Sequence, residues 1–460
     1  MQFKNNLDMM RFLISICLLL VVSCVPDNQL KPSVKSVQKT NVFTVFLTGN
    51  ELGALKPCGC SGGQLGGLDR RREVLSSVPR QRKLIVDTGS LVEGDREQDL
   101  IKFSIMIQAF SMLDYDVVNL TEKDFEIAQN LGFLRNPVVG FISSHGTNES
   151  ISAKFANRYL LQDKPIVVAV AAFDAKSARI EQIEELFPPH TGLQAVNILI
   201  LSHCDTTTID SIINMVPAVD CLVCPSDSDE PRVIGDDNER PLVISVGRFG
   251  RYVCRLDIKA AKDKDRLELS FHAIPIVEDL RQGPSLVRLY KDYQQLVKET
   301  NLLAKFPRFI LPNDLKYVGS ETCKQCHEYE YERWSTKAHA RAYATLVKAG
   351  TQYDPECVVC HVVGMEYESG FISEQKSPHL KDVGCENCHG PGSEHIKTLG
   401  KAKTVARASS PWRHGQDGRA TASCLDCHTP ETSGDYTGNE QLYLEKIRHW
   451  VEPNTTGNVK

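Results

Sequence analysis

The sequence has no excess of positive charge and is poor in aromatic residues. Its 460 residues include 53 basic and 58 acidic side chains, a net charge of -5, and only 7% are aromatic. A nucleic-acid binder needs a basic face to neutralise phosphates, so this balance argues against a nucleic-acid partner. Hydrophobic residues make up 42% of the chain, which excludes wholesale disorder. A chain of this length is expected to form more than one domain.

Long hydrophobic runs are also absent. The apolar run 12–22 follows Lys4 and Arg11 and is shorter than the roughly 20 residues that a membrane-spanning helix needs. This layout is typical of a secretory signal peptide. The residues before Cys24 resemble a bacterial lipobox, which implies lipidation of Cys24; ordinary cleavage nearby is the alternative. We therefore predict a signal peptide over 1–24, a flexible tether over 25–41, and an exported, membrane-anchored lipoprotein of the periplasm or cell envelope.

The composition changes along the chain. Residues 42–276 alternate short β-branched apolar runs with amphipathic stretches, which is typical of an α/β domain. Apolar spacing after Gly283-Pro284 predicts a helix over 285–305, and we interpret 277–316 as a connecting helix. Residues 317–452 are rich in Gly, His and Cys, so we expect a mostly helical domain organised around something other than a side-chain core. Residues 453–460 are predicted to be a disordered tail.

Sixteen cysteines are the most informative feature of the sequence. Eight of them form four C-x-x-C-H motifs within about a hundred residues, a pattern far too frequent for chance. Two thiols three positions apart on a helical turn reach both vinyl groups of one porphyrin, and the next residue meets the iron. The sequence thus predicts four covalently bound c-type haems. The attachment cysteines are Cys323, Cys326, Cys357, Cys360, Cys385, Cys388, Cys424 and Cys427, and the proximal ligands are His327, His361, His389 and His428.

Zinc knuckles are the competing interpretation of these motifs, but they would not require a histidine after every cysteine pair. Five further histidines could fill the sixth iron position. His339, His395 and His449 are the favoured candidates, with surface or propionate-bonding roles as alternatives; His379 and His414 are weaker ones. His395 follows His389 too closely to reach the far face of the same porphyrin, so we expect it to serve a neighbouring haem.

The run "YVGSETCKQCHEYEYERWSTKAHARAY", followed by "ECVVCH", "GCENCHGPGSEH" and "CLDCH", resembles the tetrahaem cytochrome c family that accepts electrons from hydroxylamine oxidoreductase. The resemblance covers about residues 317–450. It implies three haems with two histidines each and one five-coordinate haem, the second along the chain. On that basis His339, His395 and His449 are distal ligands, and His361 is the proximal ligand of an open haem. Nearby Met365 could cap an iron, although packing is the commoner role of such a residue.

Several phrases of residues 42–259 resemble the metallophosphoesterase domain of secreted nucleotidases, namely "FLTGNELG", "LIVDTGSL", "VVNLTEKDF" and "LILSH". That chemistry needs two metal ions held by carboxylates, an amide and histidines. Of the expected ligands only His203 is in place. The other positions hold Asn50, Leu52, Ser90, Glu122, Lys123, Ser226 and Ser228. We therefore predict a degenerate α/β metallophosphoesterase-like sandwich that has lost its phosphatase site.

Six cysteines remain in this first domain: Cys58, Cys60, Cys204, Cys221, Cys224 and Cys254. Most of them, with His203, could converge at the carboxyl ends of the strands. Structural disulfides, a thiolate metal site, and buried or redox-active thiols are the three interpretations. Arg70, Arg71 and Arg72 are expected to begin a solvated helix face.

Together these features predict an exported multihaem cytochrome that transfers electrons to redox partner proteins in the cell envelope, without catalytic residues of its own. One alternative is a haem oxidoreductase that acts on a small nitrogen or oxygen species at an open haem. A residual metal-dependent phosphohydrolase is the other.

Overall fold

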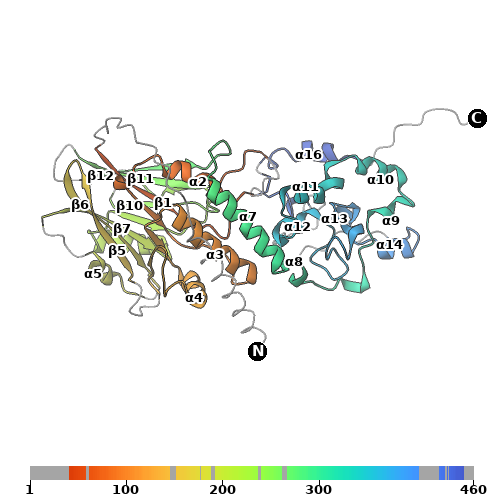
Figure 1. The fold of residues 1–460 in the computed structure, drawn as a ribbon, viewed down its shortest axis with the longest axis horizontal. Coiled ribbons are helices and arrows are strands. Elements are labelled where there is room, and N and C mark those ends of the chain that lie inside the picture. Colours follow the sequence, from red (N-terminus) through yellow and green to blue (C-terminus); the bar gives the residue numbers. More distant parts are fainter. Residues whose placement is uncertain are drawn as a thin grey trace, which may run out of the picture.

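The computed structural model describes residues 41–57, 62–145, 152–176, 178–187, 192–236, 240–261, 267–402, 424–429, 432–433 and 435–449. These residues form two parts that lie side by side along the long axis of the molecule (Figure 1). Two β-sheets and their covering helices make the first part, and short helices make the second. The predicted signal peptide with Cys24, nearly all of the tether, the tail, Cys58, Cys60 and His414 lie outside the described residues.

Two six-stranded mixed sheets form the centre of the N-terminal part. The first has the order β12 (Leu267–Pro275), β11 (Tyr252–Ala260), β1 (Val42–Thr48), β2 (Lys83–Asp87), β3 (Val117–Asn119), β4 (Gly140–Ile142). The second has the order β5 (Lys154–Leu161), β6 (Lys164–Phe173), β7 (Gln194–Leu201), β8 (Cys221–Cys224), β10 (Leu242–Ser245), β9 (Arg232–Val233). Strands β1 to β4 run parallel to one another, as do β6, β7, β8 and β10.

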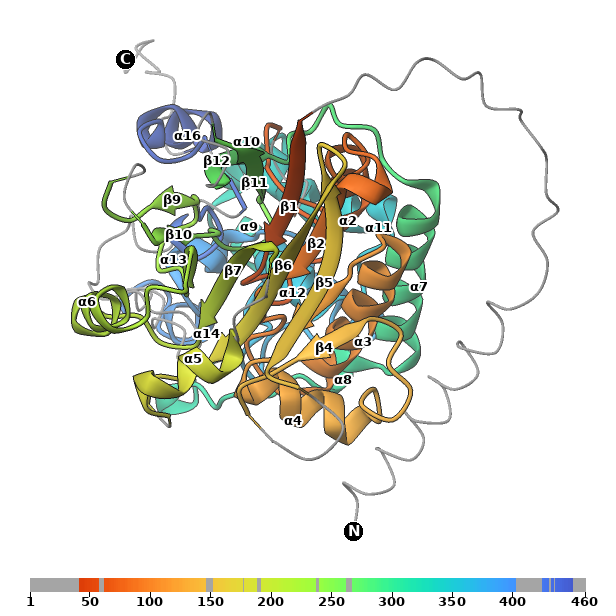
Figure 2. The same ribbon diagram turned by 90° about the vertical axis from the view of Figure 1, so that its left-hand side faces the viewer.

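Helices cover the outer face of each sheet, giving four layers (Figure 2). The first sheet is covered by α2 (Leu68–Leu75), α3 (Glu97–Met112), α4 (Glu122–Leu131) and α7 (Pro284–Glu299), and the second by α5 (Ile183–Leu186) and α6 (Thr206–Met215). Central strands therefore bury both faces and are apolar almost throughout, as in β1, where Val45 faces the other sheet and Phe46 faces the helices. The predicted α/β class of this part is confirmed.

The predicted connecting helix belongs to the first core. Helix α7 begins at Pro284, which suits a first helical turn because proline lacks the N–H that would be unsatisfied there. Its residues Leu286, Leu289, Tyr293 and Val297 are buried against α2 and α3. The helix ends at Glu299, several residues before the predicted end. It therefore packs as a structural helix of the N-terminal part and also reaches the boundary with the second part.

The second part consists of short helices joined by loops, and no named strand occurs in its described residues. Its helices are α8 (Leu302–Lys305), α9 (Ser320–Lys324), α10 (Glu328–Ser335), α11 (Ala342–Ala349), α12 (Pro355–His361), α13 (Cys385–His389), α14 (Ser393–Lys397) and α16 (Glu440–Ile447). The prediction of a mostly helical part is confirmed, but the expectation that it lacks a side-chain core is wrong. Tyr317, Val358, Val362, Met365 and Phe371 are buried in one apolar cluster. Short apolar segments far apart in sequence build this core, so no long hydrophobic run signals it. Within the described residues, no helix is both long and apolar enough to cross a bilayer.

Candidate functional site

Each C-x-x-C-H motif lies in one helical turn. The second and third motifs lie in α12 and α13, and the first spans the end of α9. In the fourth motif the His428 N–H donates to the Cys424 carbonyl at 2.8 Å, and the His327 N–H donates to the Cys323 carbonyl at 3.0 Å. A helical turn brings residues three and four positions apart onto one side, which places two thiols and the imidazole together.

Three of the motif histidines each face a histidine from elsewhere in the chain. The ring centres of His327 and His395 are 6.1 Å apart. Those of His428 and His339 are 6.2 Å apart. Those of His389 and His449 are 6.4 Å apart. His395 thus lies beside the first motif and not beside the third, to which it is adjacent in sequence.

These separations match the space that one iron between two imidazoles would need. An imidazole nitrogen binds a metal at about 2 Å and lies about 1 Å from its ring centre, so two opposed rings would have centres about 6 Å apart. Backbone carbonyls orient several of the rings through Nδ1: Ala402 O is 2.8 Å from His395, and Ile447 O is 2.9 Å from His449. Such a bond leaves Nε2 for the metal. The donor set and its spacing therefore fit haem iron.

His361 is arranged differently. Its Nδ1 lies 2.7 Å from the Ala342 carbonyl oxygen, which again leaves Nε2 for iron. Among the described residues, no second histidine ring is stacked or edge-on to it in the way seen for the other three motifs. Met365, considered as a cap, is buried in the apolar core. The second motif thus has a proximal imidazole and no described imidazole opposite it.

Burial keeps several of these imidazoles neutral. Desolvation, aided by the neighbouring His428, lowers the pKa of His339 to about 4. Desolvation also lowers the pKa of His389 and of His428. Neutral imidazole is the form that binds a metal. The protein environment therefore favours the ligating form at neutral pH.

The motifs pack in two pairs. The Cys323 and Cys385 thiols of the first and third motifs are hydrogen-bonded to each other. The buried Glu386 side chain fixes this pair by accepting hydrogen bonds from Val318, Gly319 and Gly392 N–H groups at 2.7 to 3.1 Å. The second and fourth motifs also meet, since Cys427 Sγ is 4.0 Å from the Cys360 carbonyl oxygen.

A cavity of about 850 Å³ adjoins the second and fourth motifs. Its lining includes both cysteines and the histidine of each motif, and also His339. Most ligand pockets measure about 300–1,000 Å³ and are largely apolar. The cavity therefore has the size and side chains that a bulky cofactor requires.

Comparison with known proteins agrees with this geometry. Residues 322–390 match the family of cytochrome c554 and c-prime. The chain is 30% identical over 156 residues to cytochrome c-554 of Nitrosomonas europaea, an alignment that covers 29% of this chain and 66% of that protein. The C-terminal part resembles cytochrome c554. The chain spans just under two thirds of the length of this curated relative, and the cytochrome c554-like part is joined to a long N-terminal part.

Solved structures resemble the N-terminal part. A calcineurin-like phosphoesterase of Bacillus subtilis has a TM-score of 0.44 and 13% identity, covering 56% of this chain and 98% of that one. A protein of Staphylococcus aureus described as a putative 5'-nucleotidase, in complex with α-ketoglutarate, also has a TM-score of 0.44 and 13% identity, covering 67% of this chain and 66% of that one. The two α/β sheets resemble those of metallophosphoesterases.

The structure brings Asn50, Leu52 and Ser90 close together, because the Leu52 N–H donates to the Ser90 carbonyl and the Asn50 N–H to the Gly89 carbonyl, but their side chains form no metal-binding set. The Asn50 amide donates to the Gly247 carbonyl at 3.0 Å, and exposed Lys123 donates to the Glu93 carbonyl. Ser226 donates to the Ser228 carbonyl within a local turn. His203 lies 3.5 Å from Asp205. Within the described residues, no group of three or more histidine, cysteine or acidic side chains could hold a metal ion.

A buried charged cluster lies beside these positions, and the sequence analysis missed it. The expectation of a solvated arginine face is wrong for Arg70 and Arg71, which are buried; only Arg72 is exposed. Arg71 Nη1 lies 2.9 Å from Glu51 Oε1 and 2.9 Å from the Tyr115 hydroxyl. Burial and the nearby Glu51 charge raise the pKa of Asp87 well above its usual range. The sequence spacing does indicate that Arg71 is buried, because Arg71 lies three residues after Leu68 and four before Leu75, on the apolar face of α2.

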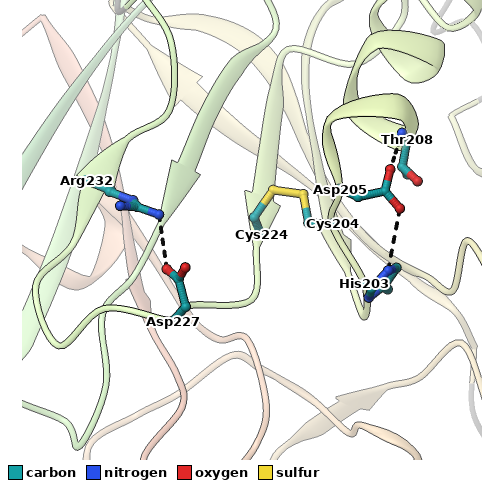
Figure 3. Close-up of a disulfide and its surroundings, with 7 residues drawn as sticks. All are labelled: His203, Cys204, Asp205, Thr208, Cys224, Asp227 and Arg232. Carbon is teal, nitrogen blue, oxygen red and sulfur yellow. Dashed lines mark hydrogen bonds and ion pairs between the residues drawn. A yellow bond between two sulfur atoms is a disulfide. The ribbon is translucent and has the colours of Figure 1, made fainter.

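Two cysteines of the N-terminal part form a disulfide (Figure 3). Cys204 follows β7, Cys224 ends β8, and their Cα atoms are 5.6 Å apart. The expected convergence of cysteines is therefore only partly correct. Cys221 lies three residues before Cys224 on the same strand, so it faces the opposite side of the sheet and is buried between the sheets. Cys254 is also a buried free thiol between the sheets.

Removing this disulfide is expected to destabilise the N-terminal part. Replacing both cysteines by serine releases a link across a sequence separation of 20 residues, for which chain entropy predicts a loss of about 3 kcal/mol. Urea unfolding of the holoprotein, followed by circular dichroism, measures the loss. A reductant should lower the stability of the wild type by more than that of the double variant, since both carry the haems and only the wild type carries the disulfide. A loss below about 1 kcal/mol would contradict a stabilising role.

Proposed function

We propose that the chain is an exported multihaem c-type cytochrome that transfers electrons in the cell envelope through four covalently bound haems. The single observation that carries the proposal is the set of three histidine pairs, each joining one motif histidine to one histidine from elsewhere. The match of residues 322–390 to the cytochrome c554 family supports it. Bound haem iron supplies one-electron redox chemistry.

In this proposal the chain holds each haem through one motif, with two thioether links and one proximal histidine. His395, His339 and His449 are the second ligands for the first, fourth and third motifs, respectively. The hydrogen bonds that Glu386 accepts hold the first and third motifs close together, and Cys427 lies beside Cys360 where the second and fourth motifs meet. Close packing of redox centres within one rigid part suits a protein that relays electrons to redox partners.

The arrangement at His361 favours a second candidate function. A motif histidine without a described imidazole partner would leave one iron position for a small nitrogen or oxygen species, as in a haem oxidoreductase. The N-terminal part contributes no phosphatase chemistry in this proposal, because the side chains at most of its ligand positions are replaced by ones that do not bind metal. Export and lipidation at Cys24 remain part of the proposal on the sequence pattern alone.

Mass spectrometry of the holoprotein, combined with electron paramagnetic resonance, tests both candidates. We expect a mass increase of four haems over the processed chain, and ferric signals from three low-spin centres and one high-spin centre. Fewer than four covalent haems would contradict the central proposal. Four low-spin signals would retain the electron-transfer function and remove the open coordination site.

A further inference from the structure

The cavity beside His361 has walls from both parts of the molecule. From the C-terminal part it is lined by Cys357, Cys360 and His361, and from the N-terminal part by the loop 52–57 that follows β1, together with Phe249. Figure 1 shows the α12 region facing the N-terminal part across this boundary. The loop 52–57 includes Leu52, the position where the phosphoesterase-like pattern would have a metal-binding histidine. One position of the phosphoesterase resemblance thus lies in the wall of the cavity.

This wall is rigid. The Leu52 and Gly53 N–H groups donate to the Ser90 and Leu91 carbonyls at 3.1 and 2.7 Å, and the Phe249 N–H donates to the Asn50 carbonyl at 2.8 Å. Leu52 has a φ of 50°, a left-handed conformation that costs a leucine about 1 kcal/mol. A strained residue held by surrounding bonds commonly marks a functional position. The side chain presented to the cavity there is apolar.

Buried polar contacts join helices α3 and α7, which contribute Lys102 and Tyr293 to the lining, to the helix that carries the second motif. Asp354 caps α12, and its carboxylate accepts from Gln98 at 2.8 Å and from Tyr293 and Gln294 at 3.0 Å. The largely buried Lys102 pairs with Glu356, one residue before Cys357. These bonds join α3 and α7 to the start of the haem-binding turn, so the two parts hold a fixed relation at this site.

The three cations that the N-terminal part contributes to the lining, Lys56, Lys102 and Arg251, are each paired with an acid, and its remaining charged lining residue, Glu93, is itself an acid. Lys56 lies 3.6 Å from Asp69, and Arg251 lies 2.8 Å from Asp229. Paired cations offer little attraction for an anionic ligand, whereas Leu52, Leu55 and Phe249 offer apolar contact. An uncharged, compact ligand fits these surroundings better than an anion does.

We propose that the N-terminal part walls in the open coordination position of the haem held by Cys357, Cys360 and His361, and admits only small uncharged ligands such as diatomic gases. This inference rests on the proposed open haem at His361. It gives the phosphoesterase-like part a function in place of hydrolysis: it is a fixed size filter for the second haem.

Stopped-flow binding to the dithionite-reduced holoprotein tests the filter, with carbon monoxide as the small probe and tert-butyl isocyanide as the bulky neutral one. We expect the wild type to bind carbon monoxide at one haem and the isocyanide at least about tenfold more slowly. Leu52→Gly should raise the isocyanide rate about tenfold and change the carbon monoxide rate little. Glycine suits the positive φ of Leu52, so this variant keeps the loop conformation.

Leu160→Ala, at an exposed position of β5, is the matched control and should leave both rates unchanged. Lys102→Met is a second variant that removes the ion pair with Glu356 and keeps a side chain of similar length in the lining, and it should also speed isocyanide binding. If the wild type bound both probes at equal rates, the size-filter proposal would be wrong. It would also be wrong if Leu52→Gly and Lys102→Met both left the isocyanide rate unchanged. Either result would still be consistent with an open coordination position at the second haem. A wild type that binds no carbon monoxide would overturn the filter and the open haem together.

Discussion

Arg71→Met is expected to destabilise the N-terminal part by about 3–5 kcal/mol, because it leaves buried acids without their cation. Glu51, Arg71 and Asp87 are each fully shielded from solvent. Arg71 pairs with Glu51 and donates to Tyr115, and Tyr115 is linked through Thr48 to Asp87. Removing one partner of such a network leaves a charge that neither water nor another cation can reach. Urea unfolding of the holoprotein, followed by circular dichroism, gives the loss.

The decrease in the free energy of unfolding caused by Arg71→Met should depend on pH. Burial and the Glu51 charge already raise the pKa of Asp87 above its value in an unfolded chain, and removing the guanidinium raises it further. The folded state then holds more protons than the unfolded state, so stability falls as pH rises from the unfolded pKa through the folded one. The deficit relative to wild type should therefore be smaller at pH 4.5 than at pH 8. Arg72→Met, at the next and exposed position of α2, is the control; a loss below about 1 kcal/mol for Arg71→Met would contradict the network.

His339→Ala is expected to leave a second haem iron with an empty sixth coordination position. The His339 imidazole faces that of His428, so alanine would leave the haem of the fourth motif with one protein ligand. The number of haems that bind carbon monoxide should rise from one to two per protein, and a low-spin ferric signal should be replaced by a high-spin one. The covalent haem count should stay at four, because the cysteines of the motif are intact. Carbon monoxide titration and electron paramagnetic resonance of the same sample measure both changes.

His379→Ala is the control for this substitution. His379 is exposed and lies in a short turn between the second and third motifs. Its replacement should leave the carbon monoxide stoichiometry and the spin states unchanged. An unchanged spectrum of His339→Ala, or an altered one for His379→Ala, would show that the pairing of His428 has been assigned wrongly.

Local patterns in the sequence predict the elements of the fold well and their long-range partners poorly. The spacing of C-x-x-C-H predicts the helical turn at each motif, and apolar alternation predicts the α/β class. The histidines of interest could also be singled out, since His339, His395 and His449 are among the few outside the motifs. The partner of each is set by chain folding over long separations, as between His339 and His428, and no local spacing encodes it.

The errors have physical causes of the same kind. Arg71 was expected in solvent because charged residues are seldom fully buried, yet Glu51, from a distant loop, supplies its partner. Cys221 and Cys224 were expected to converge at the carboxyl ends of the strands, but strand alternation points them to opposite faces. The core of the C-terminal part was missed because its apolar residues come in short segments. In each case, contacts between residues far apart in the sequence set the environment of the side chain, and local composition or spacing had indicated a different environment.

The disulfide and the haem motifs demand opposite treatment of cysteine during biogenesis. In the proposed tetrahaem protein Cys204 and Cys224 are oxidised, whereas the eight motif thiols must stay reduced until they form thioethers. Cys323 and Cys385 are in contact in the folded chain, so a premature oxidant could cross-link two different motifs. Both disulfide cysteines precede every motif cysteine in the chain, and domains fold in order as they emerge. The order of the two parts thus allows oxidative folding to finish before haem attachment begins.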